Sequence, residues 1–303
     1  MRIFCRYWKG MVINMTEMKI KRRGNKIVCK ENHFNTKDDD ILYFTFDSLE
    51  KTGIVKHCFS SRLGGVSEAH LGTMNLSYTR GDEKARVDEN YHRIAQVLGC
   101  EVGDIVCSEQ THTTNVRKVT AQDKGKGVIK TRDYSDVDGL ITNESGIVLA
   151  TFYADCVPLY IVDPVHRAIG LSHSGWRGTV NKMGAVTLKE MEKEYGTKPE
   201  EVYVVIGPSI CQECYEVSRD VAQAFEEAFP DQKDNQQLLY QKNEEKFQLN
   251  LWYANYCVFR EAGVLDNHLE VTDVCTCCNP DILFSHRASN GMRGNLGAFL
   301  SLV

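Results

Sequence analysis

Four short apolar runs follow one another between residues 138 and 173, and they constrain the fold more than any other part of the chain. They read DGLIT, IVLATFY, PLYIV and AIGLSH, with only a few residues between one run and the next. The runs are too short for helices, and their apolar residues do not alternate with polar ones. We therefore predict that these runs form central strands of a sheet.

Helical patterns lie on both sides of these runs. Apolar residues recur at helical spacing over residues 83–98, and the glycine that follows is expected to end the helix. The same spacing predicts helices over residues 179–195, 218–229 (with Ser218 as the N-cap) and 249–263. This alternation favours an α/β fold. Further short strands are expected at residues 53–61, 104–112, 115–119, 202–210, 269–275, 282–287 and 296–303.

The chain shows no linker rich in proline, glycine and serine, so we expect one folded domain. Residues 1–40 are polar and irregular and are expected to form a flexible N-terminal leader, followed by a single catalytic domain over residues 41–303. The leader is basic but has no continuous apolar stretch and no small-residue cleavage site, which argues against a signal peptide. Met15 or Met18 is an alternative start.

Composition points to a protein that acts on a small molecule. The net charge is -5, so the chain has no basic surplus of the kind that nucleic-acid binders use. No run approaches the roughly 20 apolar residues that cross a membrane. The twelve cysteines, without an export signal, are expected to be reduced thiols in the cytoplasm. The sequence indicates no oligomeric state.

Three stretches place a metal-binding residue where a strand is expected to end. They are SEQTH with His112, YADC with Cys156 and LSH with His173. One thiolate and two imidazoles suit zinc or copper, and three protein ligands leave a fourth position open, as in catalytic zinc sites that activate water. Spacing alone does not distinguish this site from a buried thiol with two hydrogen-bonded histidines.

A second metal hypothesis uses the cysteines of CQEC (Cys211, Cys214) and CTCC (Cys275, Cys277, Cys278). Four thiolates from two such pairs can close a structural zinc site. The first pair has the usual separation, whereas the second is crowded and lacks the glycine of a zinc knuckle. Inert buried cysteines are the main alternative.

A Cys-His hydrolase is a further alternative for Cys156 and His173. The two residues fit a thiolate nucleophile and its base, with Asp155 or Gln110 to orient them. Zinc that protects Cys156 from alkylation would support the metal site. Metal-free activity that is lost on alkylation would support the nucleophile.

Two other stretches contain candidate anion contacts. SSRLGGVS places Ser61 and Arg62 beside a Gly-Gly turn, and MNLSYTRGD adds Asn75 and Arg80. Arginine binds phosphate through two hydrogen bonds, and glycine lets backbone amides approach an anion. In HSGWRG, Arg177 is a similar candidate, and a helix expected after Gly178 would present its positive end. Each piece also fits a tight turn with a surface arginine.

The chain resembles the YfiH-like laccase-domain family, whose members are described as multicopper polyphenol oxidases and as purine nucleoside phosphorylases. The resemblance runs from Phe59 to the end of the chain, and the pairing of ADC with HSGWRG is specific to it. The stretches that carry it are, in order, SRLGGVS, MNLSYTRGD, EQTH, DGLIT, ADCVPLYIVDP, HSGWRGTV, IGPSICQECYEV and FSHR.

This resemblance implies a single-domain, mixed-sheet layered sandwich of the YfiH-like type that binds zinc, or alternatively copper. It implies phosphorolysis of adenosine, inosine, guanosine and methylthioadenosine to the free base and ribose 1-phosphate or its methylthio analogue, and deamination of adenosine. Purine nucleosides and phosphate are the implied partners. The implied metal ligands are His112, Cys156 and His173, which share the catalytic role with Asp155, and the expected substrate or phosphate contacts are Ser61, Arg62, Asn75, Arg177 and Arg287.

Besides the Cys-His hydrolase, three alternatives to this activity stay open. They are a polyphenol oxidase (laccase), an amidase that edits peptidoglycan precursors, and a non-catalytic binding module. The oxidase fits poorly, because a coupled multicopper centre needs many histidines and the chain has nine. The chain also departs from the family pattern, with HSGWRG for HAGWRG, FSHRAS for FSYRR and MRG for a C-terminal TGR. Arg287 is retained, but we expect the pocket wall near the C-terminus to differ.

Overall fold

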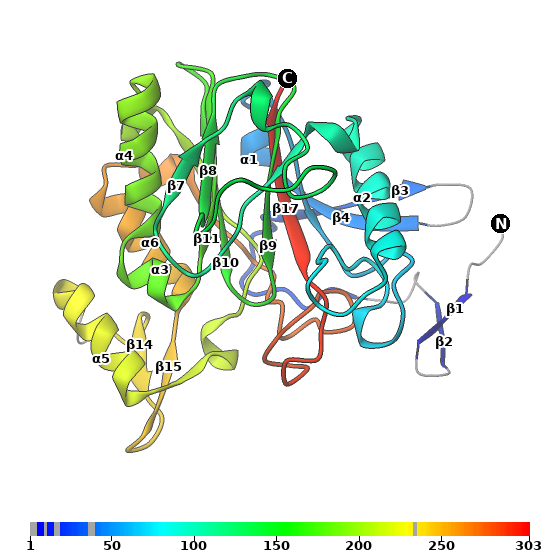
Figure 1. Cartoon of the computed structure of the whole chain (residues 1–303). Helices are drawn as coiled ribbons and strands as arrows, with labels where there is room; N and C mark the ends of the chain where they lie inside the picture. Colours follow the sequence, from blue (N-terminus) through cyan, green and yellow to red (C-terminus); the bar gives the residue numbers. More distant parts are fainter. Residues whose placement is uncertain (1–4, 9–10, 15–18, 36–39, 233–234) are drawn as a thin grey trace.

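Figure 1 shows the computed structural model of the chain, which describes residues 5–8, 11–14, 19–35, 40–232 and 235–303. Two six-stranded sheets pack face to face, and helices cover the outer face of each. We name them the β17 sheet and the β10 sheet after one inner strand of each. The predicted fold class, a layered mixed-sheet α/β sandwich, is confirmed.

The strands of both sheets come from distant parts of the chain. Three neighbouring pairs are parallel, β6 with β9, β7 with β8 and β12 with β16, and the other pairs in these sheets are antiparallel. The β17 sheet contains, in spatial order, β3 (Cys29–Asn35), β4 (Asp40–Phe46), β5 (Val55–Ser60), β17 (Leu296–Leu302), β9 (Val148–Tyr153) and β6 (Ile105–Cys107). The β10 sheet contains β16 (Leu269–Val271), β12 (Tyr203–Ile206), β10 (Val157–Asp163), β11 (Ala168–Ser174), β8 (Gly139–Thr142) and β7 (Val116–Lys118).

Smaller elements complete the chain. A three-stranded sheet consists of β13 (Glu216–Ser218), β15 (Lys246–Leu249) and β14 (Leu239–Gln241), and a two-stranded one of β1 (Cys5–Trp8) and β2 (Met11–Asn14). The α-helices are α1 (Asp47–Glu50), α2 (Lys84–Leu98), α3 (Trp176–Val180), α4 (Met183–Tyr195), α5 (Arg219–Ala228) and α6 (Leu251–Glu261).

The main core lies between the two large sheets. Phe59 of β5 and Tyr160 and Val162 of β10 are buried in it, whereas Leu159 and Ile161 of β10 face the helices on the other side. All seven residues of β10 are therefore buried. The predicted central position of this strand is confirmed, and its burial on both faces explains why this run has no polar alternation.

The outer layers are helical. The helices α4 and α6 pack against the β10 sheet, and α2 packs against the β17 sheet on the far side (Figure 1). The helix predicted over residues 83–98 is confirmed as α2, which Gly99 ends with a φ of 65°, a conformation that glycine adopts readily. Within the part of the chain that the structure describes, no helix combines the length and apolar character that a membrane span requires.

The helix expected over residues 179–195 is two helices. The first, α3, begins at Trp176, so Gly178 lies inside it and not before it. The chain then breaks at Lys182, which has a left-handed φ of 59°, and α4 begins at the next residue. The apolar spacing continues across the break, and for this reason the sequence does not reveal it.

Two smaller expectations also need correction. The run ILFSHR forms turns and not a strand, because the amides of Ile282 and Leu283 donate to the carbonyl of Asn279. Its apolar residues are buried in the main core, so the run signals burial without strand pairing. Ser218 precedes α5 as expected, but its hydroxyl pairs with Asp220 instead of capping the helix.

The folded part begins before Ile41, so the expected leader over residues 1–40 is too long. The strand β3 pairs with β4 along its whole length. Val28 and Cys29 are buried, and their amides donate to the carboxylate of Asp273 at 3.2 and 2.9 Å. Parts of the expected leader lie outside the described residues, namely 1–4, 9–10, 15–18 and 36–39.

Candidate metal centre and pocket

The candidate site lies where the chain passes from one large sheet to the other. The strands β6 and β9 are parallel neighbours, so their carboxyl ends reach the same edge of the β17 sheet. The segment after β6 carries His112, and the segment after β9 carries Cys156 directly before β10. His173 lies on β11, opposite Pro158 of β10. The topology thus brings together three residues that are far apart in sequence.

These three side chains form one compact group. Their ligand atoms all lie within 4.8 Å of one another, and Cys156 Sγ is 3.9 Å from His112 Nε2. Zinc bonds of about 2.0–2.1 Å to nitrogen and about 2.3 Å to sulfur can span such a triangle with little adjustment. His112 is exposed and His173 is buried, so the group is open on one side. The donor set and geometry fit a zinc ion with three protein ligands.

Asp138 supports two of these ligands, and sequence reasoning missed it. Its carboxylate accepts a hydrogen bond from His173 Nδ1 at 2.7 Å, which leaves Nε2 of that ring for the group. The same carboxylate accepts the backbone amides of residues 111–113, including that of His112 at 3.1 Å. A carboxylate behind a ligating histidine fixes the ring and makes it a stronger ligand. One signal in the sequence could have revealed it. Asp138 directly precedes β8, and β8 pairs with β11, the strand that carries His173.

The charges around Cys156 favour its thiolate. Burial opposes ionisation, but the neighbouring His173 and hydrogen bonds with both histidines outweigh it and lower the pKa of Cys156 to about 6. Burial also opposes protonation of His173, yet Cys156 and Asp138 raise the pKa of this imidazole above its usual value. The thiolate is the form that binds metals and acts as a nucleophile.

The HSGWRG stretch makes space for the ligands. A Cβ atom at Gly175 would lie 2.9 Å from His112 Cδ2 and 3.1 Å from Cys156 Sγ. Trp176 packs, partly buried, against the helical layer beside the β10 sheet. Arg177 lies over the ring of Trp176, 4.3 Å from its centre, and is otherwise exposed.

A pocket of about 360 Å³ opens beside the Cys/His group. Pockets of this size are typical of small-molecule sites. His112, Cys156 and His173 form part of its wall. The wall also contains the aromatic residues Tyr78, Phe152 and Tyr153 and the arginines Arg80, Arg132 and Arg293.

Two of these arginines are close enough to influence each other. Burial, followed by the charge of Arg80, lowers the pKa of Arg293 to about 10, while Asp155 and Cys156 act in the opposite direction. Like-charged guanidinium groups at a pocket wall favour binding of an anion. Arg80 belongs to the MNLSYTRGD stretch, and Arg293 to the MRG stretch where the chain departs from the family pattern.

Asp155 stands next to Cys156 but does not line the pocket. Its Oδ1 accepts the hydroxyl of Thr276 and its Oδ2 accepts the backbone amide of Arg287, both at 2.7 Å. The carboxylate therefore joins the turn before β10 to the C-terminal loop. The guanidinium of Arg287 donates to two backbone carbonyls and also lies outside the pocket wall.

Three predicted contacts, Ser61, Arg62 and Asn75, lie outside the pocket wall as well. Arg62 is buried and donates to the carbonyls of Gly72 and Pro280 at 2.9 and 2.8 Å. The hydroxyl of Ser61 accepts an amide of its own turn. The side chain of Asn75 is fully buried and hydrogen-bonded to neighbouring loops. These contacts are typical of residues that stabilise turns.

The fold and this site define a class of layered α/β proteins with a Cys/His group and an arginine-containing pocket at the junction of two sheets. The chain belongs to the family described as "Multi-copper polyphenol oxidoreductase laccase", whose model matches residues 56–303. The resemblance inferred from the sequence is thereby confirmed.

Relatives and solved structures agree with this assignment. The chain is 34% identical over 248 residues to "Purine nucleoside phosphorylase YlmD" of Bacillus subtilis. The aligned region covers 80% of this chain and 87% of the relative. The crystal structure of YlmD from Geobacillus stearothermophilus has a TM-score of 0.80 at 29% identity and covers 90% of this chain and 99% of that one. For Bacillus licheniformis hypothetical protein YfiH the TM-score is 0.81 at 29% identity, with coverage of 86% and 96%.

Proposed function

We propose that this protein is a zinc-dependent purine nucleoside phosphorylase with adenosine deaminase activity. One observation carries the proposal: a single pocket of about 360 Å³ contains the Cys/His group, aromatic side chains and the interacting pair Arg80 and Arg293. Aromatic side chains offer surface on which the base of a nucleoside can stack, and guanidinium groups bind phosphate through paired hydrogen bonds. The phosphorylase names of the relatives support the same assignment.

For phosphorolysis, Arg80 and Arg293 are the proposed phosphate contacts, in place of Ser61, Arg62 and Asn75. A phosphate oxygen forms a bond to C1′ of the sugar while the bond from C1′ to the base breaks, and the base leaves with the electron pair and takes up a proton. Tyr78 and Phe152 offer surface on which the purine can stack. Asp155 is a positioning residue in this proposal, because both of its oxygens accept hydrogen bonds that fix the turn next to Cys156.

His112, Cys156 and His173 would hold the zinc ion, with copper as the alternative. When bound, the ion would supply Lewis acidity and activation of water, which hydrolytic deamination of a purine requires. Asp138 holds the ring of His173 and the backbone of His112 in the orientation that this role needs.

Product analysis on a nucleoside panel tests the proposal. We expect purified, zinc-loaded protein to release free base from inosine, guanosine, adenosine and methylthioadenosine only when phosphate is present, and to convert adenosine to inosine without it. Cys156→Ala should lose metal and all turnover. The proposal is wrong if no base is released from any of the four and adenosine stays intact.

Two arginine variants test the phosphate contact. We expect Arg293→Gln to raise the KM for phosphate about tenfold or more, because a charge-assisted hydrogen bond contributes about 1.5–3 kcal/mol. Arg177→Gln is the matched control, since Arg177 lies on Trp176 outside the pocket wall, and its KM for phosphate should not change. If Arg177→Gln raised the KM for phosphate and Arg293→Gln did not, Arg177 would be the phosphate contact instead.

A Cys-His hydrolase remains the second candidate, because one observation favours it. Cys156, His173 and Asp138 lie in the order of nucleophile, base and orienting carboxylate, and the thiolate is favoured. Metal-free protein decides between the two. Turnover that persists without metal and disappears on alkylation of Cys156 would favour the hydrolase.

A further inference from the structure

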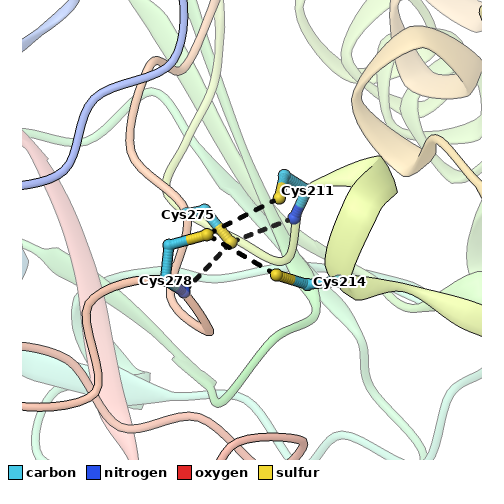
Figure 2. Close-up of side chains that lie close together, drawn as sticks. All are labelled: Cys211, Cys214, Cys275 and Cys278. Atoms are coloured by element: carbon cyan, nitrogen blue, oxygen red, sulfur yellow. Dashed lines mark hydrogen bonds between the residues drawn. The ribbon is translucent and has the colours of Figure 1, made fainter.

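A second candidate metal group consists of four cysteines (Figure 2). Its members are Cys211 and Cys214, from the segment after β12, and Cys275 and Cys278, from the segment after β16. None of them belongs to the pocket wall. Because β12 and β16 are parallel neighbours, both segments leave the same edge of the β10 sheet.

The four sulfur atoms form a compact set. All of them lie within 4.8 Å of one another, and Cys278 Sγ is 3.9 Å from Cys211 Sγ and 3.5 Å from Cys214 Sγ. Four sulfurs around one zinc ion at about 2.3 Å in a tetrahedron would be about 3.8 Å apart. A disulfide would instead join two sulfurs at about 2.05 Å, and these cysteines are free.

We propose that Cys211, Cys214, Cys275 and Cys278 bind a single structural zinc ion. Four protein ligands leave no open position, which separates this site from the three-ligand group at the pocket. The ligands then form two CxxC pairs, and Cys275 and Cys278 are the ligands from the CTCC stretch. The remaining cysteine of that stretch, Cys277, contacts Cys214 but lies outside the set of four.

The surroundings of the cluster fit bound thiolates. The backbone amides of Cys211 and Cys278 donate to Cys275 Sγ at 3.2 and 3.4 Å. The guanidinium of Arg23 donates to Cys278 Sγ at 3.1 Å, and its positive charge offsets part of the net charge of -2 that four thiolates and one zinc ion carry. Trp252 of α6 packs against Cys211 and Cys275, which are buried.

A zinc ion here would stabilise the loops behind the pocket. The backbone amide of Ile210 donates to the carbonyl of Asp155 at 3.0 Å, and the hydroxyl of Thr276 donates to its carboxylate. Ile210 directly precedes the first cysteine, and Thr276 lies between the second pair. The ion would therefore fix the residue next to Cys156 without touching the pocket.

Metal counting tests this inference. The background is the double variant His112→Ala with Cys156→Ala, which removes the Cys/His group at the pocket, so the result does not depend on the proposed function. We expect this protein, purified in reducing buffer with zinc, to retain about one zinc ion per chain by elemental analysis and native mass spectrometry. Protein without zinc, with iron instead, or with disulfides among the four cysteines would overturn the proposal.

Three further measurements keep the test independent of folding. Cys277→Ser on the same background should retain the ion, whereas Cys214→Ser with Cys278→Ser should lose it. If the latter variant does not fold, X-ray absorption on the background protein itself decides the matter. We expect four sulfur ligands at about 2.3 Å; nitrogen or oxygen ligands, or loss of zinc in Cys277→Ser, would overturn the proposal.

Discussion

At the scale of single residues, the candidate metal centre depends on a position without a side chain. Gly175 lies so close to two ligands that a Cβ atom would be 2.9 Å from His112 Cδ2 and 3.1 Å from Cys156 Sγ. The first distance is shorter than side chains tolerate, so the ligands and an alanine cannot occupy their places together. Gly175 is required for space, since its φ of -75° is available to any residue.

We therefore expect Gly175→Ala to weaken metal binding at the Cys/His group. Displaced ligands should reduce zinc affinity about 10- to 100-fold, the range seen when ligand positioning is disturbed. Competition with a chelator of known affinity measures this change. Gly178→Ala is the matched control, because its Cβ would meet no atom closer than 3.5 Å and alanine suits a helix interior. Equal losses in both variants would contradict the explanation.

His57 gives the free energy of unfolding a pH dependence. The ring is buried and its Nε2 accepts the amide of Phe46 at 2.9 Å. Burial lowers the pKa of His57 to about 4, whereas the unfolded chain titrates near the ordinary value of about 6.5. As pH falls from 6.5 to 4, the unfolded chain binds a proton that the folded protein does not, so stability is full above this window and is lost within it.

The expected loss from His57 is about 3 kcal/mol between pH 7 and pH 4. Urea unfolding of wild type and His57→Gln at several pH values measures it, because glutamine cannot titrate and can still accept the amide of Phe46. The variant should show a shallower decrease than wild type over this window. Identical pH profiles would mean that His57 does not cause the dependence.

At the scale of elements, the sequence predicts best where burial and local geometry agree. The four runs between residues 138 and 173 form strands as predicted, and α2 ends at its glycine. Prediction fails where a tertiary contact decides the backbone. The break at Lys182 leaves the apolar spacing unchanged, and residues 282–284 are buried without a strand partner.

The site was predictable to the extent that its residues stand at strand ends. His112, Cys156 and His173 follow or end strands that meet at one place, although their spacing alone did not distinguish a metal site from a buried thiol with two hydrogen-bonded histidines. Arg80 and Arg293 come from loops whose approach depends on the whole fold, so spacing cannot reveal their proximity. The cysteines after β12 and β16 differ from these arginines, because their spacing in the sequence already allowed the hypothesis of a zinc site.

At the scale of the whole molecule, the N-terminal segment belongs to the sandwich. The strand β3 forms one edge of the β17 sheet, while Arg22 and the amides of Val28 and Cys29 bind Asp273 beside the β10 sheet. Asp273 is 2% exposed, so these partners compensate for the burial of its charge. The segment thus joins both sheets, and the cysteine cluster lies next to it through Arg23.

A chain that begins at Asp40 should therefore be much less stable than one that begins at Lys19. Truncation removes β3 together with Arg22, Val28 and Cys29, which bind the Asp273 carboxylate, and loss of one member of a buried ion pair costs about 3–5 kcal/mol. Urea unfolding of the two chains measures the difference. The chain from Lys19 keeps the contacts of Arg22, Val28 and Cys29 and is the matched reference. Asp273→Asn in that reference should lose less stability than the truncation, because β3 stays paired with β4. If the chains that begin at Asp40 and Lys19 were equally stable, the role assigned to the N-terminal segment would be wrong.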